Sequence, residues 1–378
     1  MATRIVDGAQ AWQTLARDSS GQWANAAPRF ATDPFAVQHT PRFDLSETAR
    51  YFCMGSCFAR NIEEHLIYRR AEVLSKRVVS PRDEWAARAN GFLNKFTTHS
   101  MLQELRWLDQ PVGDLQSILL QTAHGWRDLQ LAPELGETSL ERAMERRRYL
   151  AQDYFPRLGQ ADVVLMTLGL NELWRDTALD LPLNAPPPLW NVRREPDRYR
   201  LEITDVQSNL AALDEIRSRL KALNPDIKIV VTVSPVPMRA TFSGQDVTMA
   251  NTLSKSTLRA AADAFAHAHP DVDYFPSYEI VSLSRRDYAF GADYMHVTNQ
   301  IVSHVMSRFM DLYCPSAPPA PEGFVELNYL DANPDVEDRV RSGELSSGFE
   351  HWLREGQAEG RALRLDAISD RARRAGAE

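Results

Sequence analysis

The chain is poor in the features that mark several specialised classes of protein. It has three cysteines in 378 residues, no C-x-x-C or H-E-x-x-H spacing, and no long apolar run. A disulfide framework and a zinc site are therefore not expected, and a membrane helix would need about 20 apolar residues in succession. We predict no metal and no cofactor, and sparse cysteine favours a reducing compartment, so we expect a cytoplasmic protein.

Basic charge is also scarce. The formal net charge is −8, and Arg146-Arg147-Arg148 is the one tight basic run before the C-terminal tail. Nucleic-acid binders usually carry a basic patch, so we expect no nucleic-acid partner. Residues 1–23 lack the apolar stretch of a signal peptide. The 44% of hydrophobic residues suffices for a globular core.

What is present is an alternation of apolar strands with amphipathic helices. Residues 1–45 are expected to be loop-like, and a strand-like segment at 73–79 is less regular. The alternation predicts an α/β fold in which a parallel sheet carries helices on both faces, with the active site at the carboxyl ends of the strands. The expected strands are 51–54, 162–168, 227–233 and 272–275, and the expected helices are 61–68, 98–108, 138–155, 205–223, 247–267 and 300–312.

The most informative segment is Gly55-Ser56-Cys57, which lies between the first strand and the first helix. A hydroxyl or thiol at such a corner faces the N-terminus of a helix, where free N–H groups and the helix dipole favour negative charge. Ser56 and Cys57 are both candidate nucleophiles for attack on a carbonyl. The alternative is that Ser56 caps the helix and does nothing more.

Two further patterns supply the partners that a nucleophile needs. Asp293 precedes His296 by three residues, so the carboxylate can orient the ring as a general base; otherwise His296 is a surface histidine. Asn171 follows the most apolar strand, and an amide donor to an oxyanion stabilises a transition state by roughly 3–4 kcal/mol; otherwise Asn171 caps a turn. The backbone N–H of Gly91 is a second candidate donor to the oxyanion, and Asn94 is a candidate to fix the loop of Gly91.

The run Gly55-Ser56-Cys57-Phe58-Ala59 resembles the signature of the GSCFA domain, a bacterial branch of the SGNH/GDSL hydrolase-like proteins. The resemblance covers about residues 51–313 and implies a three-layer α/β/α fold with a mostly parallel, flavodoxin-like sheet. It continues in order through further blocks at 94–98, 167–174, 233–237, 254–256, 274–279 and 293–296.

The resemblance also implies roles. Ser56 corresponds to the SGNH nucleophile, and its N–H, Gly91 and Asn171 correspond to the oxyanion hole. Asp293 and His296 correspond to the remaining members of the triad.

The chain departs from the general pattern at two blocks. The usual G-D-S reads Gly55-Ser56-Cys57, which keeps Cys57 as the alternative nucleophile. The usual G-x-N-D ends in Glu172. We expect Glu172 and Trp174, together with Asn94, to contact substrate.

A second unit is expected at the C-terminus. The segment 314–321 is rich in proline and predicts a linker, which divides the chain into an N-terminal extension (1–45), a catalytic domain (46–314) and a small helical module (322–378). Blocks at 329–336, 351–356 and 359–361 resemble a short helical repeat appended to bacterial glycosyltransferases and other surface-polysaccharide proteins. We expect this module to dock on the main domain, on a partner protein or on a second copy.

Together these patterns predict a serine esterase or acyltransferase that acts on a small acyl ester or a glycan through an acyl-enzyme. Hydrolysis and transfer use the same residues, so the sequence leaves both open. The segment 177–200, with Trp190, is expected to form a lid over the site. The alternative function is a non-catalytic module that binds a glycan or a partner on an SGNH-like fold.

Overall fold

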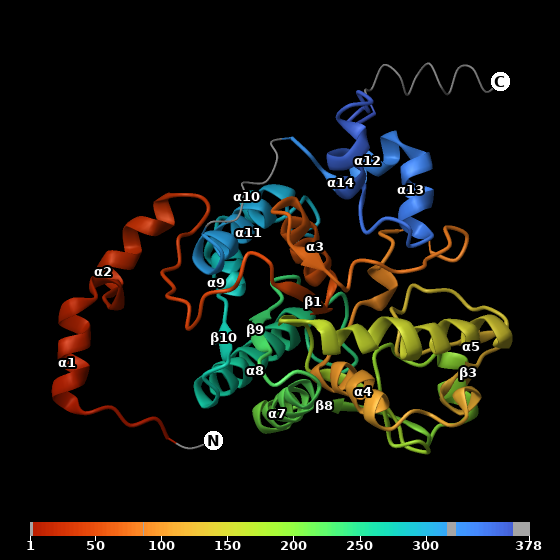
Figure 1. Cartoon of the computed structure of the whole chain (residues 1–378). Coiled ribbons are helices and arrows are strands. Elements are labelled where there is room, and N and C mark those ends of the chain that lie inside the picture. The colour runs from red at the N-terminus through yellow and green to blue at the C-terminus, as the bar shows by residue number, and fades with distance from the viewer. Residues whose placement is uncertain (1–2, 86, 316–322, 366–378) are drawn as a thin grey trace.

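The computed structural model describes residues 3–85, 87–315 and 323–365 (Figure 1). Its central sheet has five strands in the order β10-β9-β5-β1-β2, and all neighbours are parallel. Numbered along the sheet's own strands, this is the flavodoxin-like order 2-1-3-4-5. The predicted α/β class and sheet type are confirmed. The strands are β1 (Arg50–Gly55), β2 (Glu72–Val73), β5 (Val163–Leu168), β9 (Lys228–Val233) and β10 (Val272–Tyr274).

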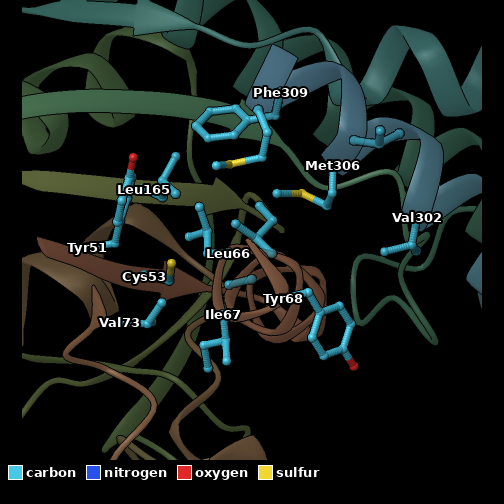
Figure 2. Close-up of a cluster of buried hydrophobic side chains, with 14 of the residues drawn as sticks. Tyr51, Cys53, Leu66, Ile67, Tyr68, Val73, Leu165, Val302, Met306 and Phe309 are labelled. Atoms are coloured by element: carbon cyan, nitrogen blue, oxygen red, sulfur yellow. The ribbon is translucent and has the colours of Figure 1, made fainter. Parts of the chain in front are cut away.

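Helices cover both faces of the sheet because its strands are apolar on both sides. In β1, Tyr51 and Cys53 point to one hydrophobic cluster, whereas Phe52 and Met54 point to the other. Figure 2 shows the first cluster, in which Tyr51, Cys53 and Leu165 meet Met306 and Phe309. The first face carries α3 (Cys57–Tyr68), α9 (Ser277–Leu283), α10 (Arg286–Ala289) and α11 (Asn299–Tyr313), and the second carries α4 (Thr98–Asp109), α5 (Leu140–Tyr149), α7 (Val206–Leu223) and α8 (Val247–Ala268).

The helix ends follow from side chains that the sequence places there. Asp205 accepts from Ser208 N at the start of α7, and Thr97 accepts from Ser100 N at the start of α4. Such caps replace hydrogen bonds that the first turn of a helix lacks. The predicted helices at 98–108, 205–223 and 247–267 are confirmed within two residues at each end.

Three expectations about local structure are wrong. Residues 1–45 contain α1 (Gly8–Arg17) and α2 (Trp23–Ala26), and Asp7 caps the first by accepting from Ala9 N and Gln10 N. The expected strand at 73–79 ends at Val73, after which the chain turns. The proline-rich segment 177–200, expected as a lid, is not one continuous loop, because it contains a strand at 181–183, a helix at 189–194 and the start of another strand at 199.

A second sheet is antiparallel, with the strand order β7-β6-β8. Leu181, Leu183 and Tyr199 give it a buried cluster of its own, which explains why a segment with many prolines is ordered. Asn191 Nδ2 ties its helix to Gln121 O at 2.8 Å. The elements of this sheet and its helix are β6 (Glu172–Asp176), β7 (Leu181–Leu183), α6 (Leu189–Arg194) and β8 (Tyr199–Ile203). Gln121 belongs to a short hairpin of β3 (Leu120–Gln121) and β4 (Trp126–Arg127).

The C-terminal residues 323–365 contain the helices α12 (Glu326–Ala332), α13 (Pro334–Arg341) and α14 (Gly348–His351), of which α14 packs on α3 (Figure 1). Tyr68 of α3 meets Phe324 and Phe349 edge-on, with ring centroids 5.5 and 5.3 Å apart. Its hydroxyl also accepts from Glu326 N at 2.8 Å. The module therefore shares its apolar core with the main domain. Most of the expected linker lies outside the described residues, at 316–322.

Among the helices in the described part of the chain, none combines the length and the apolar character needed to cross a bilayer.

Candidate functional site

The corner between β1 and α3 is built around Gly55. Its φ is +141°, and a Cβ added there would lie 2.2 Å from Thr167 Oγ1, so only glycine fits. Gly55 pairs with Thr167 in the register of β1 and β5. These two strands are adjacent in the sheet although another strand lies between them in the chain, which is the switch point where α/β sheets bind ligands.

Ser56 follows this glycine and is 3% exposed. Its Oγ lies 3.4 Å from Thr167 Oγ1 and accepts from Phe58 N at 3.4 Å, so Ser56 is the N-cap of α3. Both contacts are long, which leaves the hydroxyl weakly held. The capping role and a chemical role are therefore compatible at this residue.

Cys57 is the first residue of α3 and is more exposed than Ser56. Burial raises the pKa of the Cys57 thiol, and the charges of Arg88 and Lys255 oppose that rise only in part. A thiol attacks as its thiolate, so a raised pKa weakens Cys57 as a nucleophile near neutral pH. The geometry of the corner favours Ser56.

A turn at residues 169–171 faces this corner. A Cβ added to Gly169 would lie 3.5 Å from Ser56 Cβ and 2.9 Å from Phe96 O, so the turn approaches the nucleophile as closely as a glycine permits. Leu170 N donates to Phe96 O at 2.7 Å. Asn171 is buried, and its Nδ2 donates to Thr204 O at 3.4 Å, which is a long and therefore weak hydrogen bond.

Asp293 and His296 form a pair in the turn before α11. His296 Nδ1 lies 2.5 Å from Asp293 Oδ2, and the hydrogen bond from His296 lowers the pKa of Asp293 to about 2, helped by the N–H groups of Met295 and His296. The carboxylate holds the proton on Nδ1 and leaves Nε2 as the basic nitrogen of the neutral ring. The predicted pairing of these two side chains is thus present in the structure.

The pair lies at the same edge of the sheet as the corner. Helices α3 and α11 are neighbours, joined by His65 Nε2 and Ser303 Oγ at 3.1 Å and, near both C-terminal ends, by Arg69 and Asp311 at 3.1 Å (Figure 1). The two helices therefore begin at one edge. However, the His296 side chain is 70% exposed. In the described part of the chain, Ser56 Oγ forms hydrogen bonds with Thr167 and Phe58 but not with His296.

A model of the GSCFA family matches residues 50–309, which span every residue of the corner, the turn and the Asp–His pair. The chain belongs to the GSCFA family.

Two solved structures are similar to this GSCFA protein at low sequence identity. A carbohydrate esterase family 3 structure from Talaromyces cellulolyticus is 9% identical, with 69% of this chain and 94% of that chain covered and a TM-score of 0.26. An acetyl xylan esterase from the rumen bacterium Butyrivibrio proteoclasticus is 13% identical, with 72% and 64% covered and a TM-score of 0.29. Among curated proteins, none matches the sequence.

Two of the expected oxyanion donors in this GSCFA protein are engaged elsewhere. The N–H of Ser56 donates to Thr167 Oγ1 at 3.0 Å, because the strand register puts that hydroxyl directly beside it. The N–H of Gly91 donates to Arg88 O at 2.7 Å, and the Trp85 ring packs against Gly91. Both N–H groups therefore have partners in this structure, and the oxyanion hole formed by Ser56, Gly91 and Asn171 stays a prediction.

The three expected substrate contacts also have structural neighbours. Glu172 binds the turn after β9, since its carboxylate accepts from the Thr241 hydroxyl and from Phe242 N at 3.0 Å. Trp174 packs edge-on against Phe242, with centroids 5.3 Å apart. Glu172 and Trp174 thus contact that turn, and their contact with substrate stays a prediction. Asn94 keeps a buried Oδ1 without a hydrogen-bond partner among the described residues, one position before Lys95, whose N–H donates to Gly55 O at 2.7 Å.

Sequence reasoning missed three residues of the site. Thr167 binds the N–H and approaches the hydroxyl of Ser56, and Ser254 and Lys255 hold the turn at 169–171 from α8. The signal that could have found the latter two is the block Ser254-Lys255-Ser256 of the family resemblance, which lies inside the helix α8.

Proposed function

We propose that this protein is a serine esterase or O-acyltransferase that works through an acyl-enzyme on Ser56. The observation that carries the proposal is the corner at Gly55 and Ser56, where a weakly held hydroxyl sits at a helix N-terminus and at the switch point of the sheet. Such a position presents a nucleophile to a carbonyl and supplies N–H groups to the charge that forms.

In the proposed reaction, Ser56 Oγ bonds to the carbonyl carbon of an ester while its proton passes to Nε2 of His296. The oxyanion takes hydrogen bonds from the Asn171 amide and from the N–H of Cys57 at the start of α3, because the N–H groups of Phe58 and Ala59 already donate to Ser56. The carbonyl re-forms, the C–O bond to the leaving alcohol breaks, and His296 returns its proton to that alcohol. Water or an acceptor hydroxyl then repeats these steps and releases the acyl group.

The proposal requires His296 to reach Ser56. The imidazole is mostly exposed and lies in a turn between the short helix α10 and α11, so a change of its side-chain conformation needs little repacking. Catalytic hydrogen bonds are often long or unformed in free enzymes and tighten when substrate binds. Asp293 and His296 belong to one turn, so a movement of the whole turn carries both residues together.

The substrate class follows less directly. The resemblance of the C-terminal module to repeats in polysaccharide-related proteins supports a glycan ester, with the module as a contact to polymer or partner. The second candidate function, a non-catalytic binding module, is favoured by one observation: Ser56 already serves as a helix cap and has no contact with His296 among the described residues.

The test is covalent labelling followed by activity. The protein is incubated with a fluorophosphonate and with p-nitrophenyl acetate, and the labelled residue is mapped by mass spectrometry. Labelling at Ser56 with turnover of the ester supports the enzyme. A folded protein that is neither labelled nor active, but binds an oligosaccharide, supports the binding module instead.

A further inference from the structure

Lys255 is a buried lysine that has no counter-ion in the part of the chain that the structure describes. Its side chain lies on α8, is 1% exposed, and donates from Nζ to Gly169 O at 2.8 Å. No carboxylate among the described residues forms a salt bridge with it. Lys95 is equally buried and shows the usual arrangement, with Nζ 2.5 Å from Glu104 Oε1. A buried amine that lacks such a partner weakens the fold, so its presence calls for another explanation.

The position of Lys255 suggests that explanation. Lys255 and Ser254 are consecutive on α8 and hold opposite ends of one turn, since Nζ binds the Gly169 carbonyl and Ser254 Oγ accepts from Asn171 N at 3.0 Å. The same turn faces Ser56, because a Cβ added to Gly169 would lie 3.5 Å from the Cβ of Ser56. Helix α8 thus holds the turn at 169–171, which lies next to Ser56, by two hydrogen bonds.

We propose that Lys255 is a positioning residue of the Ser56 corner, which holds the Gly169 carbonyl and, with Ser254, fixes the turn at 169–171 so that Asn171 meets the oxyanion. This inference rests on the proposed function, because the oxyanion belongs to the acyl-transfer reaction. It adds a residue that acts through the turn rather than by contact with the substrate.

The electrostatics agree with this geometry. Burial lowers the pKa of Lys255 from 10.5 to about 7, and the Cys57 thiol on α3 acts in the opposite direction. Because the pKa in the folded protein lies below that of the free side chain, the charged lysine destabilises the fold fully below about pH 7. The destabilisation fades as the pH rises toward 10.5. If Lys255 only supported the structure, its removal would lower the melting temperature instead of raising it.

The experiment removes the amine and measures two properties. Lys255→Met keeps the shape of the side chain, and we expect fluorophosphonate labelling of Ser56 to slow about tenfold or more because the turn loses its anchor. The melting temperature should rise by a few degrees below pH 7, and the difference from the unchanged chain should shrink as the pH rises. Ser256→Ala, an exposed neighbour on the same helix, should change neither property.

The outcomes separate this inference from the proposed function. Labelling of Lys255→Met at the normal rate, or a melting temperature that falls together with labelling, would overturn the positioning role. If Lys255→Met does not fold, Lys255→Gln is the second variant, and failure of both to fold shows a structural lysine and also overturns the role. If the unchanged chain is not labelled at all, the proposed function has failed by itself. The pH dependence of melting then decides alone whether Lys255 carries an uncompensated charge.

Discussion

Gly55 and Thr167 face each other across neighbouring parallel strands, so closely that a Cβ on Gly55 would lie 2.2 Å from the Thr167 hydroxyl. The same hydroxyl accepts the N–H of Ser56 and lies 3.4 Å from its Oγ. One contact between strands therefore sets the backbone conformation before the nucleophile and the environment of the nucleophile itself.

Gly55→Ala should disrupt both the backbone conformation before Ser56 and the contacts of Ser56 itself. The added methyl group meets Thr167 and occupies a φ that L residues rarely adopt, so we expect a loss of about 3 kcal/mol or more in the free energy of unfolding. Chemical denaturation measures the loss. Gly136→Ala, at a position with no atom within 4 Å of the new Cβ, is the control and should change stability little. Equal stability of the two variants would show that the corner is not as tight as described.

Asp293 and His296 should act as one unit. Their side chains are 2.5 Å apart, and the ring depends on the carboxylate for its orientation. We expect Asp293→Ala, His296→Ala and the double variant to lose ester turnover to a similar extent, because removal of either residue leaves the other without its function. Rates are measured on p-nitrophenyl acetate. Losses that multiply in the double variant would mean that the two residues act independently.

Cys57 should react slowly at neutral pH. Burial raises the pKa of the thiol, so the reactive thiolate should form at a higher pH than the thiolate of a free cysteine does. Alkylation by iodoacetamide, followed by peptide mapping across a pH series, should show the rate at Cys57 still rising where the rate of the unfolded chain has levelled off. If the alkylation rate at Cys57 levels off at a lower pH than the rate of the unfolded chain, Cys57 is an activated thiol and a competitor of Ser56.

Arg341 should hold the C-terminal module on the main domain. It is buried, donates to Trp85 O at 2.7 Å and to Ala87 O at 2.9 Å, and its own carbonyl accepts from Ser80 N. Arg341→Ala leaves two carbonyls without these donors, and we expect a loss of about 2–4 kcal/mol in the free energy of unfolding. Arg339→Ala removes a more exposed arginine of the same helix and should cost about 0–1 kcal/mol. A milder effect at Arg341 than at Arg339 would contradict the docking.

The sheet and its helices were predictable because local signals agree with the fold. Uninterrupted apolar runs such as 163–168 belong to strands covered on both faces, and Asp205 marks the start of α7. The helix α1 was missed although its sequence is amphipathic, because none of its residues is buried and no core therefore requires it to be helical. The segment 177–200 was misjudged because its order comes from pairing with β6, which prolines do not reveal.

The candidate site was predictable where function depends on neighbours in the chain. The corner at Ser56 and the pair of Asp293 and His296 are local in sequence, and both appear in the structure. Hydrogen bonds between distant segments were not predictable. Thr167 takes the N–H of Ser56 through the strand register, and Lys255 reaches Gly169 from a helix 86 positions further along the chain.

The nucleophile itself is tested most directly by comparing Ser56→Ala with Cys57→Ala under the same fluorophosphonate. Both substitutions remove one heavy atom from adjacent residues, and circular dichroism confirms that each variant is folded. The account predicts that Ser56→Ala abolishes labelling and ester turnover, while Cys57→Ala retains both and the label maps to Ser56. Labelling that survives in Ser56→Ala and disappears in Cys57→Ala would contradict the account.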